Sequence, residues 1–585
     1  MKRTKIICTI GPAVNTYEKI CELIESGMNV ARLNFSHGTH AYHLEEINLL
    51  KKARKEMKVP LAIMLDTKGP EVRIGPVKEG NIFLKNGSLW ELTKDEIIGD
   101  ENQVSIYPSS VIDKISVGAH ILFNDGYLSS TVVEKKENSL IVRIEVGGYI
   151  GSGKGVNVPN ESLDLPAVTE KDVADICFGC KNGVDIIAAS FIRSADHIFH
   201  IKNLLAEQNA SEILVIAKIE NHEGVEHFDS IVQVSDGIMI ARGDLGVEVP
   251  LTEVPRLQKM MIRKCYLAGK PVVTATQMLE TMIEHSRPTR AETSDVANAI
   301  YDSTSSVMLS GETAIGKYPI QTVQVMRDIV MASEADFNYR KLFDDHSELN
   351  YHDVPSAVTL ATVKTAYNSQ AKAIFIFTNS GGTARLISRL RPEMPIIAVT
   401  PNKKSYNQLS FNWGVIPLLK ECNSLTEAFA EASAFALNLG IAQYGDLVVI
   451  TAGNPFGISG TTNMMIVESI GDVLVRGDEG KGKGVHGNIL FVPSSSSKKP
   501  YQVHNQILVM THCDEAFEPL IKEARGIILQ NHIDDKESEK IAHAFGETYH
   551  IPVITRADGA SLVLKQGQLV TMEPKKGLVY KGVVL

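Results

Sequence analysis

The chain has 585 residues, with 59 lysines and arginines against 69 aspartates and glutamates, which gives a net charge of −10 at pH 7. This length predicts several domains, and the acidic balance argues against nucleic acid as a partner because no basic field is available to neutralise phosphates. No apolar stretch is long enough to span a membrane, so no membrane partner is expected. The seven cysteines are few and odd in number, which is typical of reduced thiols in a cytoplasmic protein.

Apolar runs that end in polar residues recur along the first part of the chain. Eight such runs alternate with stretches such as Tyr17–Ser26, in which apolar residues have the three- and four-residue spacing of helices. Eight strand-and-helix units predict an α/β fold, the (β/α)8 or TIM barrel, with every polar cluster on one face. The runs begin at Lys5, Val30, Pro60, Asp185, Ile213, Asp236, Lys270 and Ser305.

The fifth and sixth runs end in charged residues. ILVIAKIEN places Lys218 and Glu220 at the end of one run, and DGIMIARGDLG places Arg242 and Asp244 at the end of the next. A buried parallel strand is normally apolar, and charges at its carboxyl end are where a barrel builds its site. One ammonium with two carboxylates is also what magnesium-assisted phosphoryl transfer requires. The alternative is a structural set of ion-paired strand ends.

The second and third runs end in oxygen-bearing side chains. Arg32, Asn34 and Ser36 alternate along one strand end, so their side chains are expected to point the same way, and Asp66 and Thr67 end the neighbouring strand. Such an oxygen-rich pocket suits a monovalent cation better than a transition metal. The alternative is that the Asn and Ser side chains only cap the next helix.

The barrel pattern is interrupted once, after the third run. Residues 70–167 read as short alternating segments with turn signals, which predicts an inserted β domain. An insertion at that barrel face can act as a lid that excludes water. Arg73, expected with Arg32 in the same strand ends, would give phosphate oxygens a second forked donor. Lys154 lies in the Gly-rich segment GSGKG, where the alternative is a plain solvated hairpin lysine.

A further domain is expected to begin near Tyr339. The apolar strand AKAIFIF leads into the polar turn TNSGGT, which opens a helix, and this order predicts an anion site because hydroxyls and free backbone amides face a phosphate. A second Gly-rich loop from Thr451 would close over it, and the alternative is an ordinary capped helix start. The turn comprises Thr378, Asn379, Ser380, Gly381, Gly382 and Thr383.

The expected domain organisation follows from these patterns. A barrel comprises residues 1–69 and 168–338, an inserted β lid domain residues 70–167, an α/β domain with the expected anion site residues 339–475, and an extra C-terminal domain residues 476–585. The GKGKG run at Gly480 lacks the preceding strand and the Lys-Ser/Thr end of a P-loop, so it is expected to be a linker.

Seven motifs carry a resemblance to a known family: ARLNFSHG, LDTKGPEVR, AKIENHEG, MIARGDLGVE, ATQMLETM, PTRAETSDVANA and MLSGETA. In order and spacing they resemble those of pyruvate kinases, over about Lys2–Leu474. The resemblance implies transfer of phosphate from phosphoenolpyruvate to ADP, which gives pyruvate and ATP in the final step of glycolysis. It also implies Mg²⁺ (or Mn²⁺), usually K⁺, and a homotetramer.

The resemblance assigns roles to residues that match the motifs. Glu71 matches the members that require potassium, and the TNSGGT turn would bind an allosteric sugar phosphate or AMP. A lyase or aldolase acting on a pyruvate enolate, and a non-catalytic metabolite sensor, are the alternative functions. The implied sites are catalytic Lys218, Thr276 and Arg73; substrate-binding Arg32, Lys218, Gly243, Asp244 and Thr276; nucleotide-binding Asn34, His37, Arg73 and Lys154; magnesium-binding Glu220 and Asp244; and potassium-binding Asn34, Ser36, Asp66 and Thr67.

The last part of the chain resembles the swivelling phosphohistidine domain of phosphoenolpyruvate-utilising enzymes. The Gly-Gly-x-x-Ser-His loop that would carry the phosphate is absent. The equivalent position falls near Ile541, and His543 is close but lacks the glycine loop. This domain is therefore expected to be structural.

Overall fold

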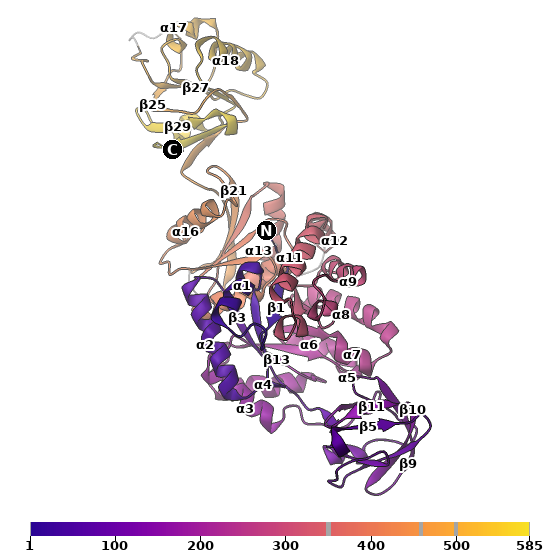
Figure 1. Ribbon diagram of the computed structural model, residues 1–585. Coiled ribbons are helices and arrows are strands. Elements are labelled where there is room, and N and C mark those ends of the chain that lie inside the picture. Colours follow the sequence, from indigo (N-terminus) through magenta and orange to yellow (C-terminus); the bar gives the residue numbers. More distant parts are fainter. Residues whose placement is uncertain (1, 347–352, 456–459, 496–500, 584–585) are drawn as a thin grey trace. The chain divides into compact units, whose positions relative to one another are not determined.

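The computed structural model describes residues 2–346, 353–455, 460–495 and 501–583 (Figure 1). The chain forms two compact units, one of Met1–Val363, Ile376–Asn423 and Ala452–Met464, the other of Lys364–Phe375, Ser424–Thr451 and Met465–Leu585. Within the described ranges, no helix is both long enough and apolar enough to cross a membrane.

Eight parallel strands close into the predicted barrel. Their order around the barrel is β1, β17, β16, β15, β14, β13, β3 and β2. Every residue of β14 and β15 is buried, as expected for strands covered on both sides. The strands are β1 (Lys5–Thr9), β2 (Val30–Asn34), β3 (Ala62–Asp66), β13 (Ile186–Ala189), β14 (Leu214–Ile219), β15 (Gly237–Ala241), β16 (Val272–Ala275) and β17 (Ser306–Leu309).

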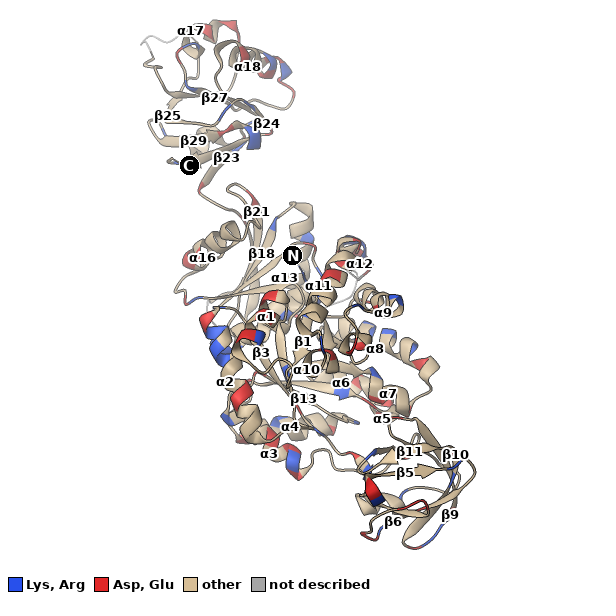
Figure 2. Cartoon of the chain, viewed as in Figure 1, with Lys and Arg blue, Asp and Glu red and all other residues tan. Residues whose placement is uncertain are grey.

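The helices between these strands pack one apolar side on the barrel. In α2, Ile47, Leu50 and Ala53 are buried, and Figure 2 marks in colour where Lys, Arg, Asp and Glu occur along this helix. Thr39 caps this helix by accepting a hydrogen bond from the Tyr42 amide. The main helices are α1 (Tyr17–Ser26), α2 (His40–Glu56), α3 (Glu170–Lys181), α4 (Ala195–Glu207), α6 (Phe228–Val234), α8 (Val254–Ala268), α9 (Arg290–Tyr301) and α11 (Pro319–Ala335), with short helices α5 (His222–Glu226), α7 (Arg242–Glu248) and α10 (Gly311–Ala314) at strand ends.

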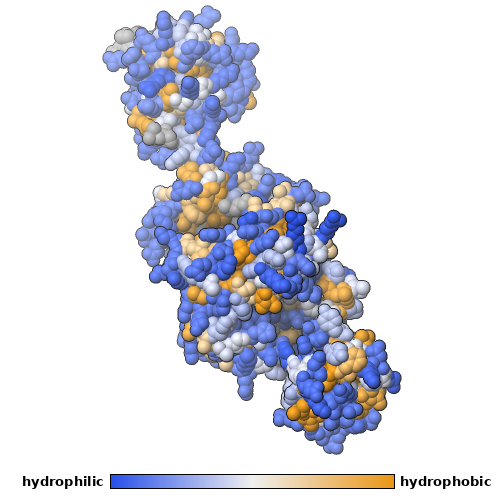
Figure 3. Space-filling view, in the orientation of Figure 1, coloured by the Kyte–Doolittle hydropathy of each residue, from blue (hydrophilic) through white to orange (hydrophobic). Residues whose placement is uncertain are grey.

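The segment between β3 and α3, which was predicted to be a β domain, forms its own closed β-barrel of seven strands. Trp90 and Phe123 meet edge to face in its core, with ring centroids 5.4 Å apart. Hydrophobic residues are also visible on its surface (Figure 3), and Leu89 and Tyr149 are among the exposed ones. Its strands are β4 (Val72–Ile74), β6 (Leu89–Thr93), β7 (Gln103–Tyr107), β8 (His120–Phe123), β9 (Leu128–Lys135), β10 (Ser139–Val146) and β12 (Gly155–Asn157), beside the pair β5 (Asn81–Leu84) and β11 (Gly148–Gly151).

A five-stranded sheet follows the barrel in the sequence. Its strand order is β20, β19, β18, β21 and β22. The strands are β18 (Ala373–Phe377), β19 (Ile396–Thr400), β20 (Val415–Leu419), β21 (Leu447–Gly453) and β22 (Thr462–Ser469), with helices α12 (Tyr339–His346), α13 (Val354–Asn368), α14 (Gly382–Arg389), α15 (Lys403–Gln408) and α16 (Leu425–Asn438).

The end of the chain folds around an eight-stranded sheet in the order β23, β30, β29, β25, β26, β27, β28 and β24. The strands are β23 (Val473–Arg476), β24 (Glu479–Lys481), β25 (Val485–Phe491), β26 (Ile507–Met510), β27 (Gly526–Leu529), β28 (Val553–Thr555), β29 (Leu569–Glu573) and β30 (Leu578–Lys581), with helices α17 (Glu518–Ile521), α18 (Lys536–Tyr549) and α19 (Ala560–Val563). The domain boundaries expected from the sequence stay predictions.

The expectation that the run at Gly480 is a linker is wrong. It forms β24, which pairs antiparallel with β28. A Cβ atom on Gly480 would lie 2.1 Å from the carbonyl oxygen of Pro574, so glycine is needed there for close backbone packing rather than for flexibility.

Candidate active site

The Lys218 ammonium on β14 is surrounded by oxygen atoms at the carboxyl end of the barrel. It donates to Asp66 Oδ1 at 3.0 Å and to Ser190 Oγ at 2.7 Å, and Glu220 Oε1 lies 2.9 Å away. The exposed fraction is 8% for Lys218 and 1% for Glu220. The neighbouring strands β3, β13 and β14 therefore bring Lys218 and Glu220 into one buried cluster with Asp66, which the sequence placed in the cation pocket.

Burial and charge oppose each other in this cluster. Burial lowers the pKa of Lys218, but Asp66 and Glu220 outweigh burial and raise this pKa above its ordinary value. Burial raises the pKa of Asp66, but Arg32 and Lys218 bring it below its ordinary value. For Glu220 and Asp244, burial and repulsion from other carboxylates exceed the attraction of Lys218, so both pKa values are raised. Lys218 therefore only partly offsets the charge of these two carboxylates.

Arg32 extends the cluster from β2. Its Nε donates to Asp66 Oδ2 at 2.6 Å and its Nη1 to Thr9 Oγ1 at 2.9 Å. The exposed fraction of Arg32 is 8%, so the guanidinium is fixed by packing as well as by its partners. His37 lies beyond β2, in the turn before α2, and its carbonyl accepts a hydrogen bond from His43 Nε2 at 2.8 Å.

Asp244 and Thr276 lie at the ends of adjoining strands. Asp244 is on α7, which begins directly after β15, and Thr276 directly follows β16. The Gly243 amide donates to Thr276 Oγ1 at 2.8 Å. Thr276 has a φ of 66°, a left-handed conformation that is rare for a β-branched residue. Strain of this kind is typical of functional sites, where the surrounding structure holds it in place.

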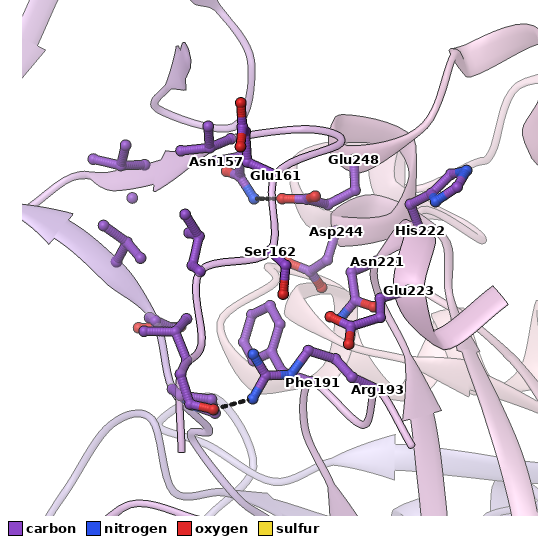
Figure 4. Close-up of a pocket in the computed structure, with 18 of the residues that line it drawn as sticks. Asn157, Glu161, Ser162, Phe191, Arg193, Asn221, His222, Glu223, Asp244 and Glu248 are labelled. Carbon is purple, nitrogen blue, oxygen red and sulfur yellow. Dashed lines mark hydrogen bonds between the residues drawn. The ribbon is translucent and has the colours of Figure 1, made fainter. Parts of the chain in front are cut away.

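A cavity of about 560 Å³ opens beside Asp244 (Figure 4). Asp244 and Glu248 line it from α7, and Asn157 of β12 donates to Glu248 Oε1 at 2.7 Å. Arg73 and Lys154 line it from the inserted domain. The cavity thus combines the buried carboxylate end of the barrel with basic side chains suited to phosphate groups.

The side chains expected to hold a monovalent cation come from adjoining strand ends. In the parallel pair of β2 and β3, Asn34 lies opposite Asp66, and Thr67 directly follows. Asn34 Oδ1 accepts a hydrogen bond from the Ser36 amide at 3.2 Å, which is a turn-capping contact. An amide oxygen has two lone pairs, so this contact leaves room for a cation.

Two expectations about side-chain placement are wrong. β2 ends at Asn34, so Ser36 lies in the following turn and strand alternation does not set its direction. Arg73 does not share the strand ends of Arg32. It lies on β4 of the inserted domain, where its Nε donates to Glu71 Oε2 at 2.7 Å. The chain leaves the barrel just after β3, and the short LDTKGPEVR motif spans both domains.

Comparisons with known proteins agree with this architecture. Residues 1–323 match the family model "Pyruvate kinase, barrel domain", and residues 356–468 match "Pyruvate kinase, alpha/beta domain". A pyruvate kinase from Geobacillus stearothermophilus is 42% identical over 588 residues, covering 99% of this chain and 99% of the relative. The chain belongs to the pyruvate kinase family. Pyruvate kinases from Bacillus licheniformis and Staphylococcus aureus (strain MRSA252) are also 42% identical, covering 100% of this chain and 99% of each relative.

Ser190 and Phe191 of this pyruvate kinase family member support the site, although neither was found from the sequence. Ser190 contacts Lys218, and the Phe191 amide donates to Glu220 Oε2 at 2.6 Å. Arg242 pairs with Asp295 and donates to the carbonyl of Thr276 at 2.8 Å, and it thereby holds the strained loop. A serine or phenylalanine after a strand has no distinctive pattern, but Arg242 was visible as a charge at a strand end.

The TNSGGT turn connects β18 to α14. Gly381 is the N-cap of α14, with a φ of 78°, and its amide donates to Thr378 Oγ1 at 3.0 Å. The hydroxyls of Thr383 and Thr462 lie 2.5 Å apart, so the start of β22 contacts the turn. Residues 456–459 of the second Gly-rich loop lie outside the described residues.

The same turn lines a second cavity, of about 450 Å³. Asn379 and Ser380 line it together with Arg385, Lys202 and Lys404. Arg385 Nη1 donates to the carbonyl of Ser380 at 3.2 Å. The sequence pattern identified the turn, but not the arginine one helical turn further along.

His543 lies on α18 of the C-terminal domain. Both ring nitrogens are buried, and neither has a hydrogen-bond partner within the part of the chain that the structure describes. Burial and the nearby Lys481 lower its pKa. An imidazole in this environment is poorly placed to receive a phosphoryl group, so a structural role for this domain stays our prediction.

Proposed function

We propose that this protein transfers the phosphoryl group of phosphoenolpyruvate to ADP, giving pyruvate and ATP, at the carboxyl ends of β14, β15 and β16. The observation that carries the proposal is the Lys218 ammonium beside Glu220, with Asp244 on the next strand end, in a chain of the pyruvate kinase family. A fixed ammonium stabilises negative charge on a phosphoryl group in transfer.

Glu220 and Asp244 are suited to hold Mg²⁺. Their raised pKa values reflect buried carboxylates that a cation would stabilise. Among the described residues, no cluster of three or more His, Cys, Asp or Glu side chains could hold a metal ion. Mg²⁺ is usually bound by one or two carboxylates together with substrate oxygens and water. When bound, the ion would neutralise charge on the phosphate oxygens.

The neighbouring residues divide the remaining tasks. Arg32 would hold the substrate phosphate through its forked donors, and the Gly243 amide would help to position the substrate. Thr276, fixed by the strained loop, would bind the substrate carboxylate or relay a proton to the enolate carbon. Arg73 and Lys154, from the inserted domain, would contact the nucleotide phosphates, with Asn34 and His37 on the barrel side. Closure of the inserted domain would exclude water.

The enzyme's activity is predicted to depend on K⁺, because a K⁺ site is proposed at Asn34, Ser36, Asp66 and Thr67. Replacing K⁺ by tetramethylammonium should lower the rate, because that ion is too large for a pocket of protein oxygens. Glu71→Lys should lessen this dependence by supplying the positive charge internally. Steady-state rates with each cation measure both effects.

Glu96→Lys is the matched control, since Glu96 is an exposed carboxylate of the same inserted domain. This variant should keep the dependence of the parent enzyme. A parent enzyme indifferent to K⁺ would refute the cation site.

The TNSGGT turn is proposed to bind the phosphate of an allosteric sugar phosphate or AMP, with Arg385 as an additional ligand. Such an effector should lower the phosphoenolpyruvate concentration for half-maximal rate, with a coupling of about 1–3 kcal/mol. Ser380→Asp places a carboxylate at the anion position, so it should abolish activation and leave basal turnover intact. Rate measurements with and without ribose 5-phosphate, fructose 1,6-bisphosphate or AMP test this.

Ser424→Asp is the control, because it adds the same charge at the N-cap of α16. It should leave activation unchanged. Full activation of the Ser380→Asp variant would contradict the assignment of the turn.

Pyruvate formation from phosphoenolpyruvate, measured with and without ADP and Mg²⁺, tests the proposed function. A kinase forms pyruvate only when both are present. An enzyme that forms pyruvate without ADP, or cleaves a larger pyruvate-derived substrate, would be the lyase or aldolase alternative. No turnover under any condition would favour the non-catalytic sensor.

A further inference from the structure

Ser190 occupies a junction between two parts of the proposed active site. It directly follows β13, which lies between β3 and β14 in the barrel. β3 ends at the proposed cation ligands Asp66 and Thr67, and β14 carries Lys218. The exposed fraction of Ser190 is 4%, so its hydroxyl bonds only to protein groups or to a molecule bound in the site.

The hydrogen-bond directions at Ser190 follow from simple chemistry. An ammonium can only donate, so Ser190 Oγ must accept from Lys218 Nζ, 2.7 Å away. The single hydroxyl proton then goes to the nearest acceptor. The Thr67 carbonyl lies 2.6 Å away and Asp66 Oδ1 lies 3.3 Å away, so the carbonyl receives it. A continuous chain of hydrogen bonds therefore runs from the lysine through Ser190 to a proposed K⁺ ligand.

The backbone around Ser190 leaves little freedom for this chain of bonds. The Ser190 amide donates to Thr67 Oγ1 at 3.1 Å, and the next amide, of Phe191, holds Glu220. Phe191 has a φ of 53°, which is rare outside glycine. A Cβ atom on Gly69 would lie 2.8 Å from Ser190 Cβ, so the opposite backbone packs directly on the serine. The hydroxyl is thus held in one place.

We propose that Ser190 is a positioning residue that couples the monovalent cation site to Lys218. This inference rests on the proposed function. The Thr67 carbonyl already accepts from Ser190, so a cation held by this oxygen would compete with the Ser190 proton for its electron density. The Ser190 hydroxyl oxygen then accepts from the Lys218 ammonium and fixes its position. Without the hydroxyl, no hydrogen bond links the cation site to Lys218 through residue 190. Asp66 and Glu220 balance the charge of the lysine, whereas the neutral serine only fixes the position of the ammonium.

Ser190→Ala tests the coupling. The variant should lower kcat by about tenfold or more, the scale of a hydrogen bond to a charged group, while the KM for phosphoenolpyruvate changes little. It should also raise the K⁺ concentration for half-maximal activation by about fivefold. Thermal unfolding gives a readout without turnover: K⁺ should raise the Tm of the wild type, and the variant should need about fivefold more K⁺ for the same rise.

Ser306→Ala is the matched control. Ser306 is a fully buried serine at the start of β17 in the same barrel, and its hydroxyl has no hydrogen-bond partner within the described part of the chain. This variant should keep the K⁺ response and kcat of the wild type. Ser190→Cys keeps a side chain of similar shape with a weaker hydrogen-bond donor, so its kcat and K⁺ response should lie between those of Ser190→Ala and the wild type. It replaces Ser190→Ala in the test if the alanine variant does not fold.

The outcomes separate the inference from the proposed function. A K⁺-dependent wild type with an unchanged K⁺ response in both Ser190 variants would overturn the inference alone. A wild type whose activity and Tm are indifferent to K⁺ would overturn the cation site and the inference with it. A K⁺ response shifted in the Ser190 variants and unchanged in Ser306→Ala supports the coupling.

Discussion

Lys218→Met should lower kcat by about 10³-fold or more and leave the KM for phosphoenolpyruvate little changed. The ammonium is buried, fully charged and fixed by three oxygen-bearing side chains, so it is ready to meet the charge of a phosphoryl group in transfer without reorganisation. Arg32 and the proposed metal site remain in the variant, so ground-state binding should survive. Steady-state kinetics with varied phosphoenolpyruvate at saturating ADP measure the two parameters separately.

The lysine substitution needs two controls. Lys264→Met removes a partly exposed lysine that pairs with Asp229, and it should leave kcat unchanged. Circular dichroism and thermal unfolding must show that Lys218→Met is folded, because two buried carboxylates lose a partner. Near-normal turnover in a folded Lys218→Met protein would contradict its assignment.

Glu220→Gln and Asp244→Asn should each raise the Mg²⁺ concentration for half-maximal rate by at least about 10–100-fold. Loss of a residue that only supports a metal ligand already lowers metal affinity by about this factor, and these two residues are proposed as the ligands themselves. Each change replaces an anionic ligand by a neutral one of the same shape. In Glu220→Gln the side-chain oxygen can still accept from the Phe191 amide, so the local backbone should stay in place. Mg²⁺ titrations at saturating substrates measure the shift.

Glu226→Gln is the control for the metal prediction. Glu226 lines the same cavity but its side chain is 60% exposed and pairs with His222. The Glu226→Gln variant should have the same Mg²⁺ requirement as the wild type. An unchanged requirement in both ligand variants would refute the metal site.

The barrel could be predicted from the sequence because its strands have a strong local signal. β14 and β15 are completely apolar until the charged residues that end them, and the parallel barrel forces those ends onto one face. Lys218 and Glu220 could thus be expected together before any geometry was known. In the structure, Lys218 Nζ lies 2.9 Å from Glu220 Oε1.

The predictions that were wrong concern residues whose position depends on contacts between segments far apart in the sequence. Arg73 follows Asp66 by a few residues, but the chain changes domain between them, and no local pattern marks that point. The glycines around Gly480 indicate either flexibility or close packing, and only the neighbouring backbone distinguishes the two. Ser190 follows β13 and bonds to Lys218 of β14 and to Thr67, which follows β3. A single serine in a sequence does not reveal these contacts.

The central claim is direct phosphoryl transfer from phosphoenolpyruvate to ADP at the Lys218 cluster. The most direct measurement follows phosphoenolpyruvate labelled in its phosphate through one turnover with Mg²⁺, K⁺ and ADP. The account predicts that the label appears in ATP in amounts equal to the pyruvate formed, and that Lys218→Met slows the formation of both products to the same extent. Label released as inorganic phosphate, or pyruvate formed without ADP, would contradict it.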